Sequence, residues 1–142
     1  MTEPAAPFSA ISAELVELFD LAINECVKAK RAGSFKSPFL VLQEPPGGEI
    51  LVLAGASTEA SLESGRQAVR AARSTVRAYA IAYDGLLRSK TGEPLDAFIV
   101  ELGERGCADG FVMFHLYELA GDEIDLIQQT RTVLRRTDPL FT

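Results

Sequence analysis

The chain has few of the residues that build metal sites and disulfide-stabilised folds. Its 142 residues contain one histidine, His115, two cysteines, Cys26 and Cys107, and no tryptophan. A single histidine excludes metal sites built from several imidazoles, and two distant cysteines do not make a disulfide framework. We therefore expect no metal site and two free thiols, each buried like a small apolar side chain.

Basic charge and long apolar runs are also scarce. Lysine and arginine number 14 against 20 acidic residues, which gives a net charge of -6. Such a surface disfavours nucleic acid and anionic membranes as partners. The N-terminal residues MTEPAAPFSA lack the cationic and apolar regions of a signal peptide, and no apolar run approaches the thickness of a bilayer. Free thiols fit a reducing compartment, so we expect a cytoplasmic protein without a membrane or nucleic-acid partner.

The common catalytic and nucleotide-binding motifs are missing as well. The sequence has no GxGxxG, no Walker loop, no paired CxxC, no HExxH and no GxSxG. We therefore expect no cofactor and no catalytic residue of those classes. The length predicts a single domain over residues 1–142, with residues 1–7 frayed.

Two segments have the spacing of amphipathic helices. In the first, Phe8 to Ala32, apolar residues recur three and four apart, and Ser9 or Ser12 can cap the start. Residues 57–73 form the second, with glutamates early and arginines late, as the helix dipole favours. Its arginines are spaced three or four residues apart and continue toward the next strand: Arg66, Arg70, Arg73 and Arg77. This spacing predicts either an anion site or a solvated face, and we favour the solvated face.

The remaining segments predict strands. Phe39–Gln43 and Glu49–Ala54 flank the turn residues 45–48 and predict a hairpin. Residues 77–118 predict three antiparallel strands joined by two glycine-containing connections. The tail, residues 122–136, is ambiguous, because Asp122 can cap a helix while the β-branched residues favour a strand, which we prefer.

These elements predict an α+β fold with the order α-β-β-α-β-β-β-(β or α). We expect a mixed or antiparallel sheet of about five to six strands, with both helices on one face. The order is similar to that of profilin-like or roadblock-type domains, a likeness of fold that implies no function.

Side-chain alternation predicts a sheet with two apolar faces. If both connections pair odd with even residues, Ile81 lies opposite Val100, and Val100 lies opposite Met113. Aromatic side chains then share one face, and alanines share the other and allow close helix packing. Because two helices would leave the aromatic face bare, we expect a homodimer.

Glu101 is the residue hardest to explain as part of the sheet. A carboxylate among apolar neighbours must be paired, protonated or at an edge, and Lys28 or an arginine of the second helix would satisfy it. The alternative is a ligand or acid–base group in a pocket with Tyr83, Asp84 and His115. In the expected register His115 and Glu101 point to opposite faces, so they cannot form a catalytic pair.

The other unusual residues have ordinary structural interpretations. We expect His115 to be hydrogen-bonded or half-exposed near a strand end. Glu104, Arg105 and Cys107 lie near a connection between strands, where we expect solvated turn residues.

From Ala80 to Tyr117 the elements YDG, DA, VE and ERG follow one another before a further glycine. This pattern resembles one that recurs in uncharacterised small bacterial proteins, and it covers about a third of the chain. The resemblance implies a bacterial, sheet-rich protein and transfers no catalytic residue.

The sequence leaves three hypotheses for function. The first is a non-enzymatic binding or regulatory module that acts through a protein partner. The second is a small enzyme or ligand-binding protein whose pocket uses Glu101 and its neighbours. The third is a chaperone-like protein for a secreted or toxic partner.

Overall fold

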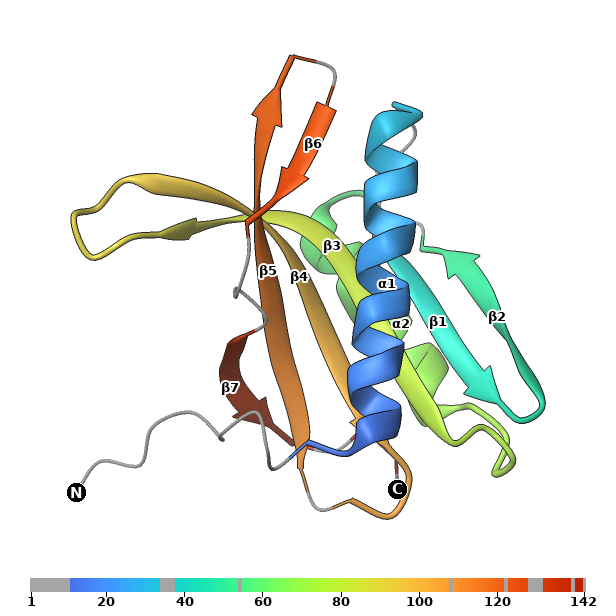
Figure 1. Cartoon of the computed structure of the whole chain (residues 1–142). Helices are drawn as coiled ribbons and strands as arrows, with labels where there is room; N and C mark the ends of the chain where they lie inside the picture. The colour runs from blue at the N-terminus through green and yellow to red at the C-terminus, as the bar shows by residue number, and fades with distance from the viewer. Residues whose placement is uncertain are drawn as a thin grey trace, which may run out of the picture.

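The protein has an α+β fold, as predicted, with two helices and a curled antiparallel sheet (Figure 1). The computed structural model describes residues 11–33, 38–53, 55–107, 109–121, 123–127, 132–138 and 140–141. Its elements follow in the order α1 Ala13–Arg31, β1 Phe39–Glu44, β2 Gly47–Val52, α2 Thr58–Arg70, β3 Ala78–Arg88, β4 Pro94–Glu104, β5 Gly110–Ala120, β6 Glu123–Leu126 and β7 Thr132–Thr137.

The sheet runs in the order β2-β1-β3-β4-β5-β6, and β7 also pairs with β5. Each of these pairings is antiparallel. β6 follows one half of β5 and β7 follows the other half, so both short strands lie along the same side of β5. The strand interpretation of the tail is therefore confirmed for its described residues, and it raises the sheet to seven strands.

Local sequence signals set the ends of several elements. The Ser12 hydroxyl accepts a hydrogen bond from the Leu15 amide at 3.2 Å, and Ser57 caps α2 in the same way. Gly33 follows α1 with a φ of 70°, which glycine adopts without strain. The hairpin turn is shorter than predicted, because it uses only Pro45 and Pro46 and β2 already begins at Gly47.

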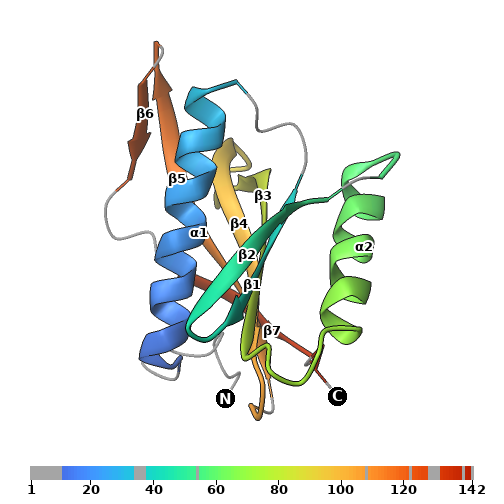
Figure 2. The same cartoon turned by 90° about the vertical axis from the view of Figure 1, so that its right-hand side faces the viewer.

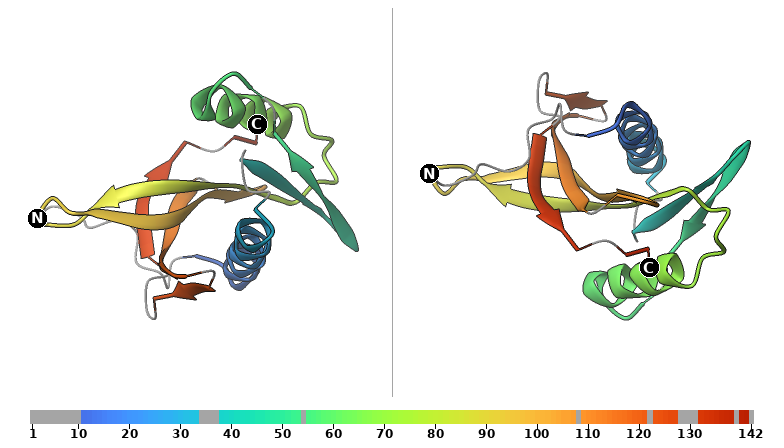
Figure 3. Two further views of the ribbon diagram at one scale, coloured as in Figure 1. Left: turned by 90° about the horizontal axis from the view of Figure 1, so that it is seen from above. Right: turned by 90° about the horizontal axis from the view of Figure 1, so that it is seen from below.

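The two helices lie on opposite faces of the sheet, so the prediction that they share one face is wrong (Figures 2 and 3). Strand β1 shows why, because its side chains alternate. Val41 packs in the cluster under α1, whereas Leu40 and Leu42 pack in the cluster under α2. A strand that is apolar at successive positions needs cover on both faces, and one helix on each face supplies it.

The predicted register is correct between β4 and β5 and wrong by one residue between β3 and β4. Val100 pairs with Met113 as expected, but its partner on β3 is Ala82 and not Ile81. The connection of residues 89–93 contains an odd number of residues. It therefore pairs odd-numbered residues of β3 with odd-numbered residues of β4, and even-numbered with even-numbered. The alanines of β3 therefore join the large apolar residues of β4 beneath α1, and Ile81 lies directly opposite Glu101 beneath α2.

Both cysteines are free, as predicted. Cys26 is buried in the core under α1. Cys107 is exposed after β4, so its interpretation as a buried thiol is wrong and its interpretation as a solvated turn residue is correct. Among the described residues, no helix combines the length and the apolar character needed to cross a bilayer.

Candidate functional site

The four residues singled out from the sequence do not form one site. Asp84 lies opposite Phe98, which lies opposite His115, so Asp84 and His115 share the α1 face. Tyr83 and Glu101 share the α2 face. The expectation that Glu101 and His115 point to opposite faces is confirmed, and the sheet itself separates the two halves of the predicted set.

Glu101 is held by Arg66 of α2, one of the two kinds of partner predicted for it. The guanidinium donates from Nε to Oε1 at 3.0 Å and from Nη2 to Oε2 at 2.7 Å, a bidentate pair. The side chains of Arg66 and Glu101 are only 20% and 9% exposed. Hydrogen bonding to Glu101 is the main cause that raises the Arg66 pKa, so the buried carboxylate faces a permanent cation. Lys28, the other predicted partner, instead pairs with Glu25.

Three of the four arginines predicted as a spaced set form ion pairs: Arg66, Arg70 and Arg73. Arg66 contacts Glu59 and Glu63 in addition to Glu101, and Arg70 contacts Glu63. Arg73 lies beyond the end of α2 and pairs with Glu44 of β1. They do not form a single basic face on the helix.

Asp84 belongs to a second polar cluster on the other side of the sheet. Its carboxylate accepts hydrogen bonds from Lys30 Nζ and from the Tyr117 hydroxyl, each at 2.6 Å. Burial, together with the bond to Asp84, raises the pKa of Tyr117 to about 12. The Tyr117 ring stacks on Phe98 with 4.2 Å between ring centroids. Sequence reasoning missed Lys30 and Tyr117, because they reach Asp84 only through long-range packing.

His115 and Arg105 have structural roles in the fold. His115 Nε2 lies 3.0 Å from the carbonyl oxygen of Ile127, which confirms a bonded histidine, but His115 lies in the middle of β5 and not near a strand end. Arg105 differs from the solvated residue expected, because its Nε donates to the Val76 carbonyl at 2.9 Å and its guanidinium lies over the Phe141 ring. It joins the start of β3 to the C-terminal segment.

The pKa shifts keep the affected groups in their ordinary charge states at neutral pH. Burial raises the pKa of Cys26, Tyr79 and Tyr83, and a hydrogen bond to Asp84 raises that of Lys30. A general acid or base works best with a pKa near the operating pH. These shifts move the pKa values further from neutral pH, so they prepare none of these groups for proton transfer.

A different feature, the strand β2, stands out as a candidate binding surface. It is the end strand of the sheet order, and all six of its residues are exposed. Ile50 is 50% exposed, Val52 is 79% exposed, and Leu51 is exposed between them. The pattern of the hairpin predicted a strand here but carried no sign that this strand lies at an edge.

On the α1 side of β2 there is a mainly apolar groove of about 320 Å³, whose lining also includes Gln43 and Glu49. Leu18 and Leu21 of α1 form one wall, and Val41, Pro46 and Ile50 of the hairpin are among the residues of the other. Leu21 is 45% exposed at the groove, although it belongs to a helix whose other large apolar residues are mostly buried.

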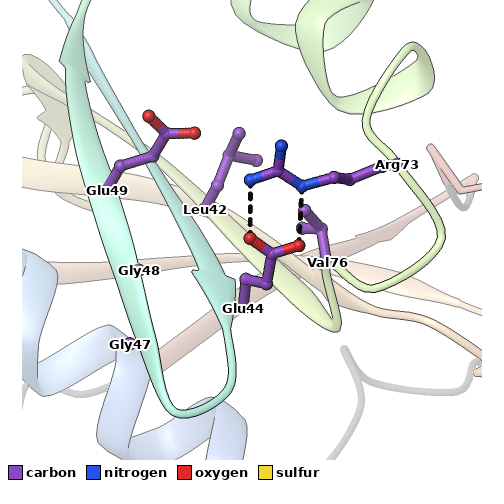
Figure 4. Close-up of a pocket in the computed structure, with 7 residues that line it drawn as sticks. All are labelled: Leu42, Glu44, Gly47, Gly48, Glu49, Arg73 and Val76. Carbon is purple, nitrogen blue, oxygen red and sulfur yellow. Dashed lines mark hydrogen bonds and ion pairs between the residues drawn. The ribbon is translucent and has the colours of Figure 1, made fainter.

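On the α2 side of β2 there is a groove of similar size with charged walls, about 330 Å³ (Figure 4). Arg73 donates from Nε and Nη2 to the two oxygens of Glu44 at 2.7 and 2.6 Å, and Thr75 also donates to Glu44. The hydrogen bonds from Arg73 and Thr75 lower the Glu44 pKa to about 2. Glu49 projects from β2 into the same groove as a second carboxylate.

Comparisons of the chain with protein-family models, with curated proteins and with solved structures gave no match. The resemblance of residues 80–117 to small bacterial proteins therefore stays a prediction. Any statement about function depends on the geometry of the chain itself.

Proposed function

We propose that this protein is a non-enzymatic binding or regulatory module that acts through a protein partner. The partner adds an extended segment to strand β2. The observation that carries the proposal is the open edge of β2, which combines exposed backbone groups with three consecutive exposed apolar side chains. Strand addition at a sheet edge is a common mode of peptide recognition.

The direction of the backbone groups supports strand addition. The Leu53 amide donates to the Pro38 carbonyl at 2.9 Å, so residue 53 faces β1. In an antiparallel ladder, successive residues direct their N–H and C=O groups to opposite sides. The N–H and C=O groups of Ile50 and Val52 therefore point away from β1, toward the open edge.

The side chains of β2 support the same conclusion. Natural proteins usually protect an edge strand with charge, proline or a covering element, because a bare apolar edge pairs with other chains. Here Ile50, Leu51 and Val52 are exposed together, and Leu21 extends the apolar surface onto α1. An apolar edge of this kind indicates a surface that a partner covers.

A pair of variants at one position tests the proposal. Val52→Pro removes an outward amide donor, whereas Val52→Thr keeps the donor and nearly the same shape. We expect the wild type and Val52→Thr to retain a partner from native cell extract, and Val52→Pro to lose it. Hydrogen exchange of the isolated complex should show new protection at the amides of Ile50 and Val52.

Two results would overturn the proposal. One is equal retention of the partner by Val52→Pro and Val52→Thr, with circular dichroism showing that both are folded. The other is protection in the complex that leaves β2 unchanged and appears at another surface.

A chaperone-like role for a secreted or toxic partner would use the same edge, and the nature of the captured protein separates it from a regulatory role. The enzyme hypothesis has less support, because Glu101 is bound by Arg66 and lies across the sheet from His115. A cytoplasmic location also stays a proposal, supported by the two free thiols.

The homodimer predicted from the sequence is a separate proposal. Its original reason, a bare sheet face, is weakened because α1 and α2 cover opposite faces. Sedimentation equilibrium at micromolar concentration measures it directly. A mass that stays at the 15.3 kDa of one chain would contradict a dimer.

A further inference from the structure

The two sides of strand β2 offer different chemistry to an added strand. Ile50 and Val52 pair with Val41 and Phe39, whose side chains belong to the α1 side. Glu49 and Leu51 pair with Leu42 and Leu40, whose side chains belong to the α2 side, so this side carries one carboxylate and one exposed leucine. Because a strand added to β2 continues the sheet, its own side chains must alternate between these two sides.

The α1 side favours apolar side chains. Its groove is bounded by Leu21 and Ile50, and Val52 extends the apolar surface along the strand. Alternate residues of an added strand would cover these exposed side chains and remove them from water.

The α2 side favours cationic side chains. Two carboxylates, Glu44 and Glu49, and one guanidinium, Arg73, line its groove (Figure 4). Arg73 is bound by Glu44 through two hydrogen bonds, and Glu49 acts on Arg73 only through its charge, so two carboxylates face one guanidinium in this groove. The remaining lining residues carry no charge: Leu42, Gly47, Gly48 and Val76.

The glycines at the start of β2 leave both grooves open. Gly47 and Gly48 border both grooves and place no side chain in either one. An added strand therefore has room for long side chains beside this end of β2. Leucine or isoleucine on one side and lysine or arginine on the other would fit the dimensions and charges described above.

We infer that the segment recognised by β2 is an extended strand in which apolar and basic residues alternate. The inference rests on the proposed strand addition and adds the chemistry of its ligand. A second copy of β2 fits less well, because a symmetric antiparallel pair would bring the Glu44 and Glu49 carboxylates of both copies onto one face. Like charges that face each other across strands are destabilising.

Synthetic peptides of eight residues test the inference by fluorescence anisotropy. The probes alternate leucine with lysine, leucine with serine, or leucine with glutamate. A fourth peptide is the leucine–lysine sequence with N-methyl groups on alternate amides. We expect the leucine–lysine peptide to bind up to about fivefold more tightly than the leucine–serine peptide for each lysine placed beside a carboxylate, and the leucine–glutamate peptide to bind most weakly.

Protein variants separate the specific site from general attraction to an acidic protein. Glu49→Gln should reduce affinity for the leucine–lysine peptide and leave the leucine–serine peptide unchanged. Glu93→Gln removes an exposed carboxylate from the β3–β4 connection and should change neither peptide. Leu21→Ser should weaken both peptides, whereas Leu86→Ser, at an exposed leucine of β3, should weaken neither.

The outcomes distinguish the inference from the proposed function. Equal binding of the lysine, serine and glutamate peptides would overturn the charge pattern and leave strand addition standing. Failure of every alternating peptide, or undiminished binding of the N-methylated peptide, would overturn strand addition itself. Equal losses in Glu49→Gln and Glu93→Gln would show that only net charge attracts the peptide, which contradicts the inference.

Discussion

The two helices cover the same sheet by different means. α1 buries six residues of its apolar face, and all six belong to one continuous core: Leu15, Leu18, Phe19, Ala22, Ile23 and Cys26. α2 buries four residues, of which Leu62 and Val69 are the larger apolar ones and Ser61 and Gly65 are small. The ion pair of Arg66 with Glu101 adds a polar link between α2 and the sheet.

The surface beneath each helix explains the difference. Under α1 the strand β3 presents Ala78, Ala80 and Ala82, whose small side chains let a helix with large apolar residues approach closely. Under α2 the same strand presents Tyr79 and Ile81, so the space is filled from the sheet and the helix contributes small residues. At Gly65, an added Cβ would lie 2.7 Å from Leu53 Cδ1, which leaves no room for a larger side chain without movement.

The largest effect should come from the apolar contact of α1. Phe19→Ala should lower the free energy of unfolding by about 3–5 kcal/mol, because Phe19 is fully buried and its removal leaves a cavity. Leu62→Ala in α2 removes fewer buried atoms and should cost less than Phe19→Ala, within the range of about 2–5 kcal/mol for buried leucines. Urea denaturation measures both, and an equal or larger loss for Leu62→Ala would contradict the contrast between the helices.

A smaller effect should come from the ion pair of α2. Glu101→Gln should destabilise the protein by about 1–3 kcal/mol, because Arg66 then loses its most buried partner. The matched variant Glu63→Gln changes an exposed contact of the same arginine and should destabilise the protein less than Glu101→Gln does.

A double-mutant cycle sharpens this prediction. When Arg66 is replaced by Met, the further change Glu101→Gln should cost less than it does in the wild type, because the pair is already broken. A stability of Glu101→Gln equal to that of the wild type, together with lost partner binding, would instead assign Glu101 to a binding site.

The smallest effect concerns the polar cluster beside α1 at high pH. The Tyr117 pKa is raised to about 12, whereas the pKa of a tyrosine in the unfolded chain is about 10. The neutral phenol therefore stabilises the folded state below pH 10, and this contribution is lost as the pH rises from 10 to 12. Tyr117→Phe should reduce that decline in the denaturation midpoint, and an identical decline in both proteins would contradict it.

The sequence was sufficient for features that depend on near neighbours. The end of α1 at Gly33 and the strands of the hairpin follow from short spacings, because local backbone geometry decides them. The sequence offered Ser9 or Ser12 as the cap of α1, and the structure decided for Ser12. The pairing of Glu101 with an arginine of α2 was also predictable, because a carboxylate among apolar residues requires a cation or a proton.

Features that depend on distant residues were missed or mistaken. The register between β3 and β4 differs from the expected one by a single residue. Because strand faces alternate with a period of two, this shift changed which residues of β3 share a face with each residue of β4. The cluster of Lys30, Asp84 and Tyr117 joins one helix and two strands, and no local spacing marks it. The edge position of β2 was equally hidden, since an edge strand and a central strand can share the same alternation.

The sequence by itself determined the α+β class, the order of the described helices and the first five strands, the two free thiols and the need of Glu101 for a partner. Only the tertiary structure decided that the helices lie on opposite faces, and that Tyr83 shares a face with Glu101 while Asp84 shares one with His115. It also decided that β2 is the end strand of the sheet, with a mainly apolar groove on its α1 side and a groove with charged walls on its α2 side. The physical reason is that apolar periodicity and helix propensity depend on residues close together in the sequence. Strand order and register depend instead on which distant segments pair.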